Sequence, residues 1–175
     1  GKHVYPGLIL ASSQLGLSEV PTVRATVDAS ELGDLNPNVR SIVAYNTDSK
    51  VINTLRSNGI LLAGVYPDGS LLTGSSSVVQ LDAWNWEDAA YATDNGIYLN
   101  MPSLLTRRGG RGGFGGFGQQ QPQGDPIKRA LDQLEVVKVF LREAKAYAEA
   151  PTHTTTNLKL EAVKGLFTKK QKLFI

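Results

Sequence analysis

The sequence predicts an α/β fold with parallel strands, because its apolar pattern changes between a helical and an extended period. Residues 51–55 place an apolar face at helical spacing, and directly after Gly59 the pattern becomes a continuous apolar run over 60–66. A helix that feeds a buried strand across a single glycine is typical of an α/β unit. A second apolar run over 8–15 and a long amphipathic stretch over 125–150 supply a further strand and a further helix. An all-α or all-β fold is therefore disfavoured.

The first expected element is a buried strand over 8–15. Its residues are small or apolar until the polar residues Ser12, Ser13 and Gln14 interrupt the run near its end. Polar residues at the end of such a strand usually face a mouth or a pocket. Residues 39–45 form a short piece whose sequence fits either an extended or a helical conformation.

A helix, a turn and a second pair of extended segments follow. Asp48 is the expected N-cap of the helix that ends before Gly59. The segment 71–81 predicts a turn rich in glycine and serine that leads into a short apolar strand. Trp84 and Trp86 come next, and packing in the core or at an interface is the default expectation for such side chains.

The second half of the chain contains a low-complexity segment and a strong helix. After an extended candidate at 97–101, the segment 107–124 is rich in glycine, arginine and glutamine, so we expect a disordered insertion. Asp125 as N-cap and Pro126 at the first helical position then predict a helix that runs to about residue 150.

The C-terminal part predicts a shorter helix and one more strand. Asn157 is the expected N-cap of a helix over 158–164, which Gly165 should end. Residues 172–175 predict the beginning of another strand.

The charges divide unevenly along the chain. Of its 175 residues, 1–106 carry 5 basic and 10 acidic side chains, whereas 107–175 carry 13 and 6. Such asymmetry fits either a polyanionic partner or two surfaces that neutralise each other, and we favour the second. Cysteine is absent, which excludes disulfides, thiolate nucleophiles and cysteine-ligated zinc. No apolar run approaches the length of a membrane span.

The N-terminal segment resembles the first barrel strand of the amidohydrolase superfamily, specifically the imidazolonepropionase-like metal-dependent hydrolases. The resemblance rests on Gly1-Lys2 and on the Pro-Gly-Leu-Ile sequence at 6–9, which in that family lead into His-x-His. The matching positions here are Ser12 and Gln14. Further blocks that resemble the family are 56–59, 71–88 and 144–162.

The resemblance implies part of a (β/α)8 barrel, incomplete in this chain because a whole barrel usually needs roughly 250 residues. The first barrel strands and helices would occupy 1–106, the insertion 107–124, and the long helix, short helix and next strand 125–175, all in one domain. The family activity is hydrolysis of non-peptide or dipeptide C–N bonds with a bound divalent metal such as zinc. A full-length relative would hold that metal, and no cofactor is expected in this chain.

The replaced ligand positions define the candidate site. A hydroxyl and an amide do not substitute for imidazole toward zinc, so Ser12 and Gln14 either line a pocket or fill the space that lost ligands leave. We favour the second reading, and we expect no catalytic or metal-binding residue in this stretch. His3 and His153 are isolated in sequence and are expected at the surface.

Three functions remain in order of preference. The first is a fragment of an amidohydrolase-like protein with impaired or absent hydrolysis. The second is a pseudoenzyme or a subunit that binds a ligand or a partner. The third, nucleic-acid binding through the arginine and glycine segment at 107–124, is disfavoured because that segment is short and internal. The expected partner is the remainder of the barrel or a second chain, which includes a homo-oligomer. No association with a membrane is expected. The compartment is unknown, and secretion or a periplasmic location would require an upstream signal peptide.

Overall fold

The computed structural model describes residues 1–69, 71–103, 125–150 and 155–175. Its elements are β1 (Leu8–Ser13), a short 3-10 helix (Arg24–Thr26), α1 (Ser41–Ala44), α2 (Lys50–Ser57), β2 (Ile60–Val65), β3 (Leu72–Gln80), α3 (Trp86–Ala89), β4 (Ala90–Leu99), α4 (Pro126–Glu149), α5 (Leu158–Ala162), α6 (Lys164–Phe167) and β5 (Lys172–Phe174). The predicted insertion at 107–124 lies outside the described residues.

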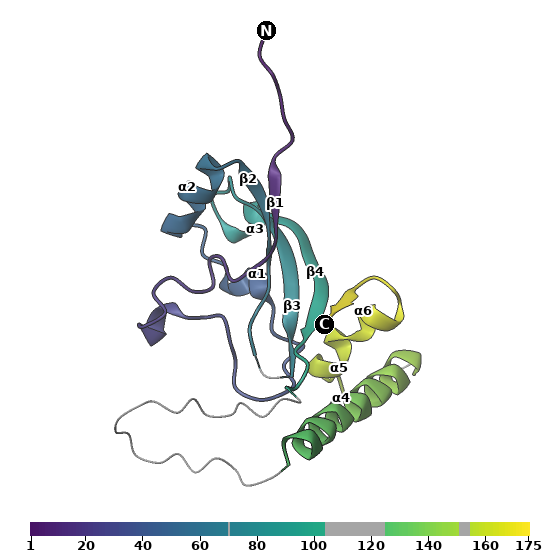
Figure 1. Ribbon diagram of the computed structural model, residues 1–175. Coiled ribbons are helices and arrows are strands. Elements are labelled where there is room, and N and C mark those ends of the chain that lie inside the picture. The colour runs from purple at the N-terminus through teal and green to yellow at the C-terminus, as the bar shows by residue number, and fades with distance from the viewer. Residues whose placement is uncertain (70, 104–124, 151–154) are drawn as a thin grey trace, which may run out of the picture.

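One curled sheet forms the centre of the molecule, with strand order β1-β2-β3-β4-β5 (Figure 1). Beyond one end of the sheet, α4 lies next to α5 and α6, and these two short helices lie beside β4. Near the other end, α2 packs beside β2, and the N-terminal residues extend away from the sheet. This mixed α/β arrangement is consistent with part of a barrel.

The sheet is mixed, so the expectation of parallel strands holds only at its two edges. β1 pairs with β2 in parallel and β4 with β5 in parallel, whereas β2–β3 and β3–β4 are antiparallel. The connections explain the difference, because a parallel crossover needs about a dozen residues or more. Only 66–71 join β2 to β3, and only 81–89 join β3 to β4.

Two apolar clusters form the core. The first lies between β2, β3 and the segments 15–45 and 50–57, and consists of Leu15, Leu17, Ala29, Ile42, Tyr45, Ile52, Ala63, Val65, Val79, Leu81 and Ala89. The second joins β3 and β4 to the C-terminal helices, and consists of Leu71, Leu72, Ile97, Leu99, Val137, Phe140, Ala144 and Val163. The second cluster therefore holds the C-terminal helices against the sheet.

Several local expectations differ from the structure. Leu8 and Ile9 of β1 are 62% and 65% exposed rather than buried, because β1 is an edge strand that the described residues leave uncovered. Trp84 is exposed and Trp86 is partly exposed, so neither belongs to the core. The N-cap of α2 is Ser49 instead of Asp48.

The serine-rich segment and the C-terminal helices also differ from expectation. Residues 73–77, expected in a turn, belong to β3 and are buried. Gly165, expected to end a helix, lies within α6, where a Cβ would collide with the side chain of Gln171. The predicted cap of α4 is confirmed, since the Asp125 carboxylate accepts a hydrogen bond from the Ile127 N–H.

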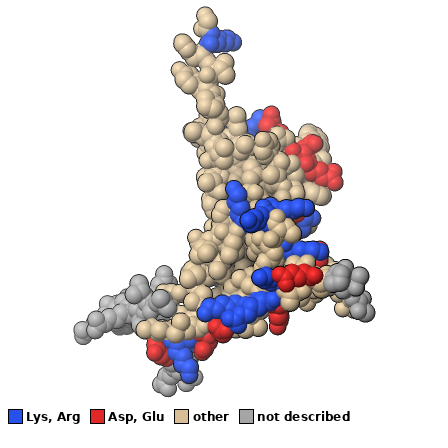
Figure 2. Space-filling view, turned by 90° about the vertical axis from the view of Figure 1, so that its right-hand side faces the viewer, with Lys and Arg blue, Asp and Glu red and all other residues tan. Residues whose placement is uncertain are grey.

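The basic excess of the C-terminal part is visible at the surface. Lys and Arg side chains gather on the face that carries the C-terminal helices (Figure 2). Residues 125–175 contain 10 basic and 6 acidic side chains. Among the described helices, none is both long and apolar enough to span a membrane.

Candidate functional site

The two residues at the replaced ligand positions lie at the end of β1 in different local structures. Ser12 is on the strand and exposed, and its hydroxyl lies 3.4 Å from the Tyr98 hydroxyl. Gln14 follows the strand, and its carbonyl accepts a hydrogen bond from the Leu17 N–H at 3.0 Å, which begins a turn. The alternation that would aim two side chains at one ion therefore ends before Gln14.

An aromatic stack lies beside Ser12. The rings of Tyr66 and Tyr98 stack with centroids 4.4 Å apart, and those of Tyr98 and Phe174 with centroids 4.8 Å apart. The three rings come from the end of β2, from β4 and from β5. Each lies in or at the end of an apolar run in the sequence. The contact among the three rings depends on the sheet order.

The donors at the end of β1 do not fit a divalent metal such as zinc. Zinc sites in proteins use imidazole, thiolate or carboxylate ligands, whereas Ser12 and Gln14 offer neutral oxygens. Within the described residues, no group of three or more His, Cys, Asp or Glu side chains could hold a metal ion. His3 is on the exposed N-terminal segment, with its ring centroid 6.5 Å from that of Tyr5. His153 lies outside the described residues.

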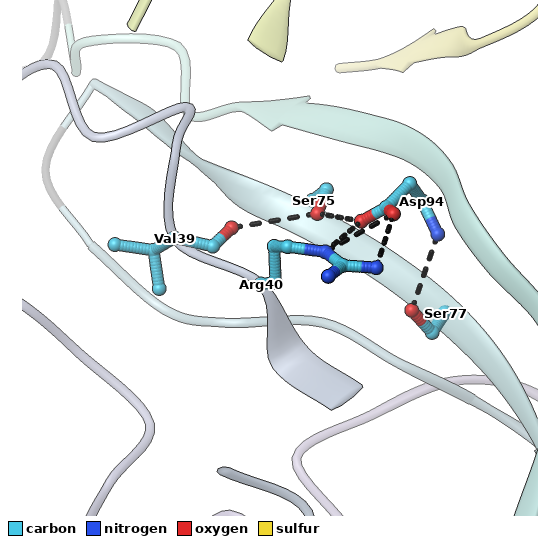
Figure 3. A network of polar contacts seen from close by, with 5 residues as sticks. All are labelled: Val39, Arg40, Ser75, Ser77 and Asp94. Carbon is cyan, nitrogen blue, oxygen red and sulfur yellow. Dashed lines mark hydrogen bonds and ion pairs between the residues drawn. The ribbon is translucent and has the colours of Figure 1, made fainter. Parts of the chain in front are cut away.

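A polar network connects β3, β4 and the segment before α1 (Figure 3). Arg40 donates from Nε to both carboxylate oxygens of Asp94, at 2.9 and 3.1 Å, and from Nη2 at 2.6 Å. The Ser75 hydroxyl lies 2.6 Å from the same carboxylate, and the Ser77 hydroxyl accepts from the Asp94 N–H at 3.3 Å. The carboxylate is therefore held by two side chains from separate segments.

The backbone brings these groups together by a close approach. The Ser75 N–H donates to the Val39 carbonyl at 2.7 Å, so the chain before α1 runs along β3. Gly74 makes this approach feasible, because a Cβ there would collide with that carbonyl. Asp94 has a φ of 52°, a left-handed conformation that aspartate tolerates better than most residues.

The electrostatics of the network keep both partners charged. Burial by itself would raise the pKa of Asp94, but the hydrogen bonds from Arg40 and Ser75, together with the Arg40 charge, hold that pKa below its ordinary value. The hydrogen bonds to Asp94 raise the pKa of Arg40, against the opposing effect of burial. The pair is thus ionised throughout the neutral range.

The network forms one wall of a cavity of about 640 Å³. The opposite wall comes from α5, α6 and the residues between α6 and β5. There Lys164 pairs with Glu161 at 3.5 Å, and Lys170 and Gln171 complete the lining. The sequence alone did not indicate this cavity, because its walls are separated by more than sixty positions along the chain.

The cavity and Ser12 lie on opposite sides of the sheet. Ser75 is paired with Ile97, and Ile97 packs in the cluster that includes α4 residues. Successive residues of a strand point to opposite faces, so Tyr98, which contacts Ser12, faces the other side. The molecule therefore has one polar cavity on its helix-covered face and one aromatic surface on the other face.

Comparison with known proteins supports the barrel interpretation at the level of the fold. The sequence matches no family model and no curated protein. Among solved structures, the chain is similar to an amidohydrolase from Thermotoga maritima MSB8, with a TM-score of 0.72 and 18% sequence identity. The match covers 97% of this chain and 44% of that protein. The chain thus has an amidohydrolase-like fold and spans less than half the length of that neighbour.

Proposed function

We propose that this chain is part of an amidohydrolase-like protein in which hydrolysis of non-peptide or dipeptide C–N bonds is impaired or absent. The observation that carries the proposal is the pair of residues at the end of β1. Ser12 contacts a tyrosine hydroxyl, and Gln14 begins a turn. Neither offers the imidazole that the resemblance would place there.

The physical reason is the chemistry of the water nucleophile. Metal-dependent hydrolases lower the pKa of a bound water and polarise the substrate carbonyl with the same ion. The residues at the end of β1 do not supply donors for that ion. A site that lacks two of its expected ligands would bind metal weakly and turn over slowly.

The test measures metal content and hydrolysis in the wild-type protein and in the double variant Ser12→His, Gln14→His, which should gain only weak metal binding because position 14 lies beyond the strand. After extensive dialysis, elemental analysis should find no tightly held zinc or similar metal in the wild type, and assays with amides and dipeptides should show no hydrolysis. The control is Ser13→His, which places one imidazole on the neighbouring strand position. About one zinc per wild-type chain, with amide hydrolysis that a chelator abolishes, would contradict the proposal.

The second candidate is a role in binding without turnover. The observation that favours it is the cavity of about 640 Å³ on the helix-covered face, which lies within the size range of small-molecule sites. A ligand-binding pseudoenzyme needs such a cavity but no metal.

The remainder of a barrel, or a second chain, is the partner that we propose for the sheet. Within the described residues, β1 and β5 each have a strand neighbour on one side only, and Leu8 and Ile9 are exposed. Edge strands with exposed apolar residues favour pairing with another strand. Sedimentation of the wild type and of Ile9→Lys should reveal self-association that the charge reduces, and a monomeric wild type would argue against a second copy.

A further inference from the structure

We infer that the cavity between β3–β4 and α5–α6 binds a small organic anion, a carboxylate or a phosphate monoester, that also carries a hydroxyl or amino donor. This site is separate from the position of Ser12 and Gln14. The inference does not depend on whether the protein hydrolyses C–N bonds.

The cavity has the dimensions and the mixed lining of a small-molecule site. Its volume of about 640 Å³ lies within the usual range of 300–1,000 Å³. Pro37, Leu158 and Ala162 supply apolar surface, whereas Thr93 and Thr168 add hydroxyls. A ligand with one apolar part and one polar part matches this lining.

The charges of the lining favour an anion. Three cationic side chains, Arg40, Lys164 and Lys170, meet two carboxylates, Asp94 and Glu161. Each carboxylate has its own cation, at 2.6 and 3.5 Å respectively, so the excess positive charge belongs to Lys170. A ligand carboxylate or phosphate would balance that charge.

Arg40 is prepared to take part in such binding. Its bonds to Asp94 use Nε and Nη2, which leaves the N–H groups of Nη1 outside the ion pair (Figure 3). Because Asp94 is also bonded to Ser75, the guanidinium is held in one orientation before any ligand arrives. Fixed donors lose less entropy on binding than mobile donors do.

Gln171 adds a preference for a donor on the ligand. Its Oε1 is buried and has no hydrogen-bond partner in the described part of the chain, although the residue lines the cavity. A buried acceptor without a partner is unusual and calls for an explanation. A hydroxyl or amino group of the ligand would satisfy it once the side chain turns away from Gly165, against which the oxygen now lies. The absence of a Cβ at Gly165 provides the room for the Gln171 side chain.

The test uses the full chain and four aromatic probes: mandelate, which has a carboxylate and a hydroxyl, phenylacetate, which has only the carboxylate, phenyl phosphate, and the neutral benzyl alcohol. Binding is measured by isothermal titration and by chemical-shift changes in NMR spectra. We expect mandelate or phenyl phosphate to bind, and benzyl alcohol not to bind. The preferred anion distinguishes a carboxylate site from a phosphate site.

Two variants locate the binding. Lys170→Gln should weaken the binding of the anion by about tenfold or more, since bonds to charged groups are among the stronger ones. Lys172→Gln is the matched control, because Lys172 is a neighbouring exposed lysine on β5 that does not line the cavity. Equal weakening by both variants would show binding to general surface charge and would overturn the inference.

The preference for a donor is tested separately. Gln171→Leu should weaken the binding of mandelate more than the binding of phenylacetate. Equal effects on the two affinities would refute the role of Gln171. The anion site itself is refuted if neither mandelate nor phenyl phosphate binds at about 10 mM, a concentration at which even weak specific sites are occupied. The results of the metal and hydrolysis tests for Ser12 and Gln14 would not change the interpretation of these binding measurements.

Discussion

Replacement of Asp94 by asparagine tests the polar network most directly. Asparagine has nearly the same shape as aspartate, and it also tolerates the left-handed backbone conformation at this position. It can still accept the hydrogen bond from Ser75. The substitution therefore removes the negative charge that faces Arg40 and leaves the backbone and the packing almost unchanged.

The magnitude follows from the geometry and the exposure of the pair. Arg40 and Asp94 are joined by three short contacts, but their side chains are 47% and 32% exposed, so water screens part of the attraction. A fully exposed pair contributes about 0.2–1 kcal/mol, and hydrogen bonds to charged groups about 1.5–3 kcal/mol. We expect Asp94→Asn to lower the free energy of unfolding by about 1–2 kcal/mol, or the Tm by about 2–8 °C.

The pH dependence has a definite sign. The pKa of Asp94 in the folded protein is below its ordinary value of 3.8, so the carboxylate stabilises the fold above that pH. The stabilisation is lost as the pH falls through the folded pKa. The difference between wild type and Asp94→Asn should therefore be largest near pH 7 and should shrink below about pH 4.

Urea denaturation followed by far-UV circular dichroism is the appropriate assay. Tryptophan fluorescence is less suitable, since Trp84 is 89% exposed and Trp86 is 43% exposed in the folded protein. The matched control is Asp82→Asn, because the Asp82 carboxylate in its pair with Arg56 is 84% exposed. That control should cost less than about 0.5 kcal/mol. Equal effects of the two substitutions at pH 7, or an Asp94 effect that does not change with pH, would refute the reasoning.

Three further substitutions test other features. Tyr45→Phe should raise the free energy of unfolding by about 1 kcal/mol, because the Tyr45 hydroxyl is buried without a partner among the described residues. Burial also raises the pKa of the Tyr45 hydroxyl from 10.0 to about 12. The wild type should therefore lose stability between pH 10 and 12 relative to the variant. Urea denaturation at pH 8 and at pH 11 would show this difference. Gly74→Ala should lower the free energy of unfolding by about 1–3 kcal/mol through the collision with the Val39 carbonyl, and a variant as stable as wild type would contradict that close approach. Asp125→Ala should cost about 1 kcal/mol by removing the cap of α4, as measured by thermal denaturation, and an unchanged Tm would argue against the cap.

Local patterns in the sequence predicted most of the helices and strands. The period change at Gly59 located α2 and β2, and Asp125 with Pro126 located the start of α4. The same patterns do not contain strand direction, which depends on how the short connections turn. The expectation of parallel strands therefore failed at β3, which pairs antiparallel with both of its neighbours.

The candidate sites were predicted less completely than the fold. The residues at the end of β1 were found because they stand in a short contiguous motif that resembles a known strand. The cavity depends on Arg40, Asp94 and Lys170, which come from three distant segments. Single charged residues of this kind carry no local signal, because most of them are merely solvated. Only the contact between β3–β4 and the C-terminal helices brings them to one place.

The second core cluster has a consequence for synthesis of the protein. Leu72, Ile97 and Leu99 pack against Val137 and Val163, which leave the ribosome much later. About 60 residues separate the end of β4 from the last of these partners, which corresponds to roughly 3–12 s at about 5–20 residues per second. During that interval the apolar residues on the helix-covered face of β3 and β4 are exposed to solvent. We therefore expect the nascent chain to need a chaperone at this stage, and slower elongation through the segment before α4 would lengthen the exposure of this surface.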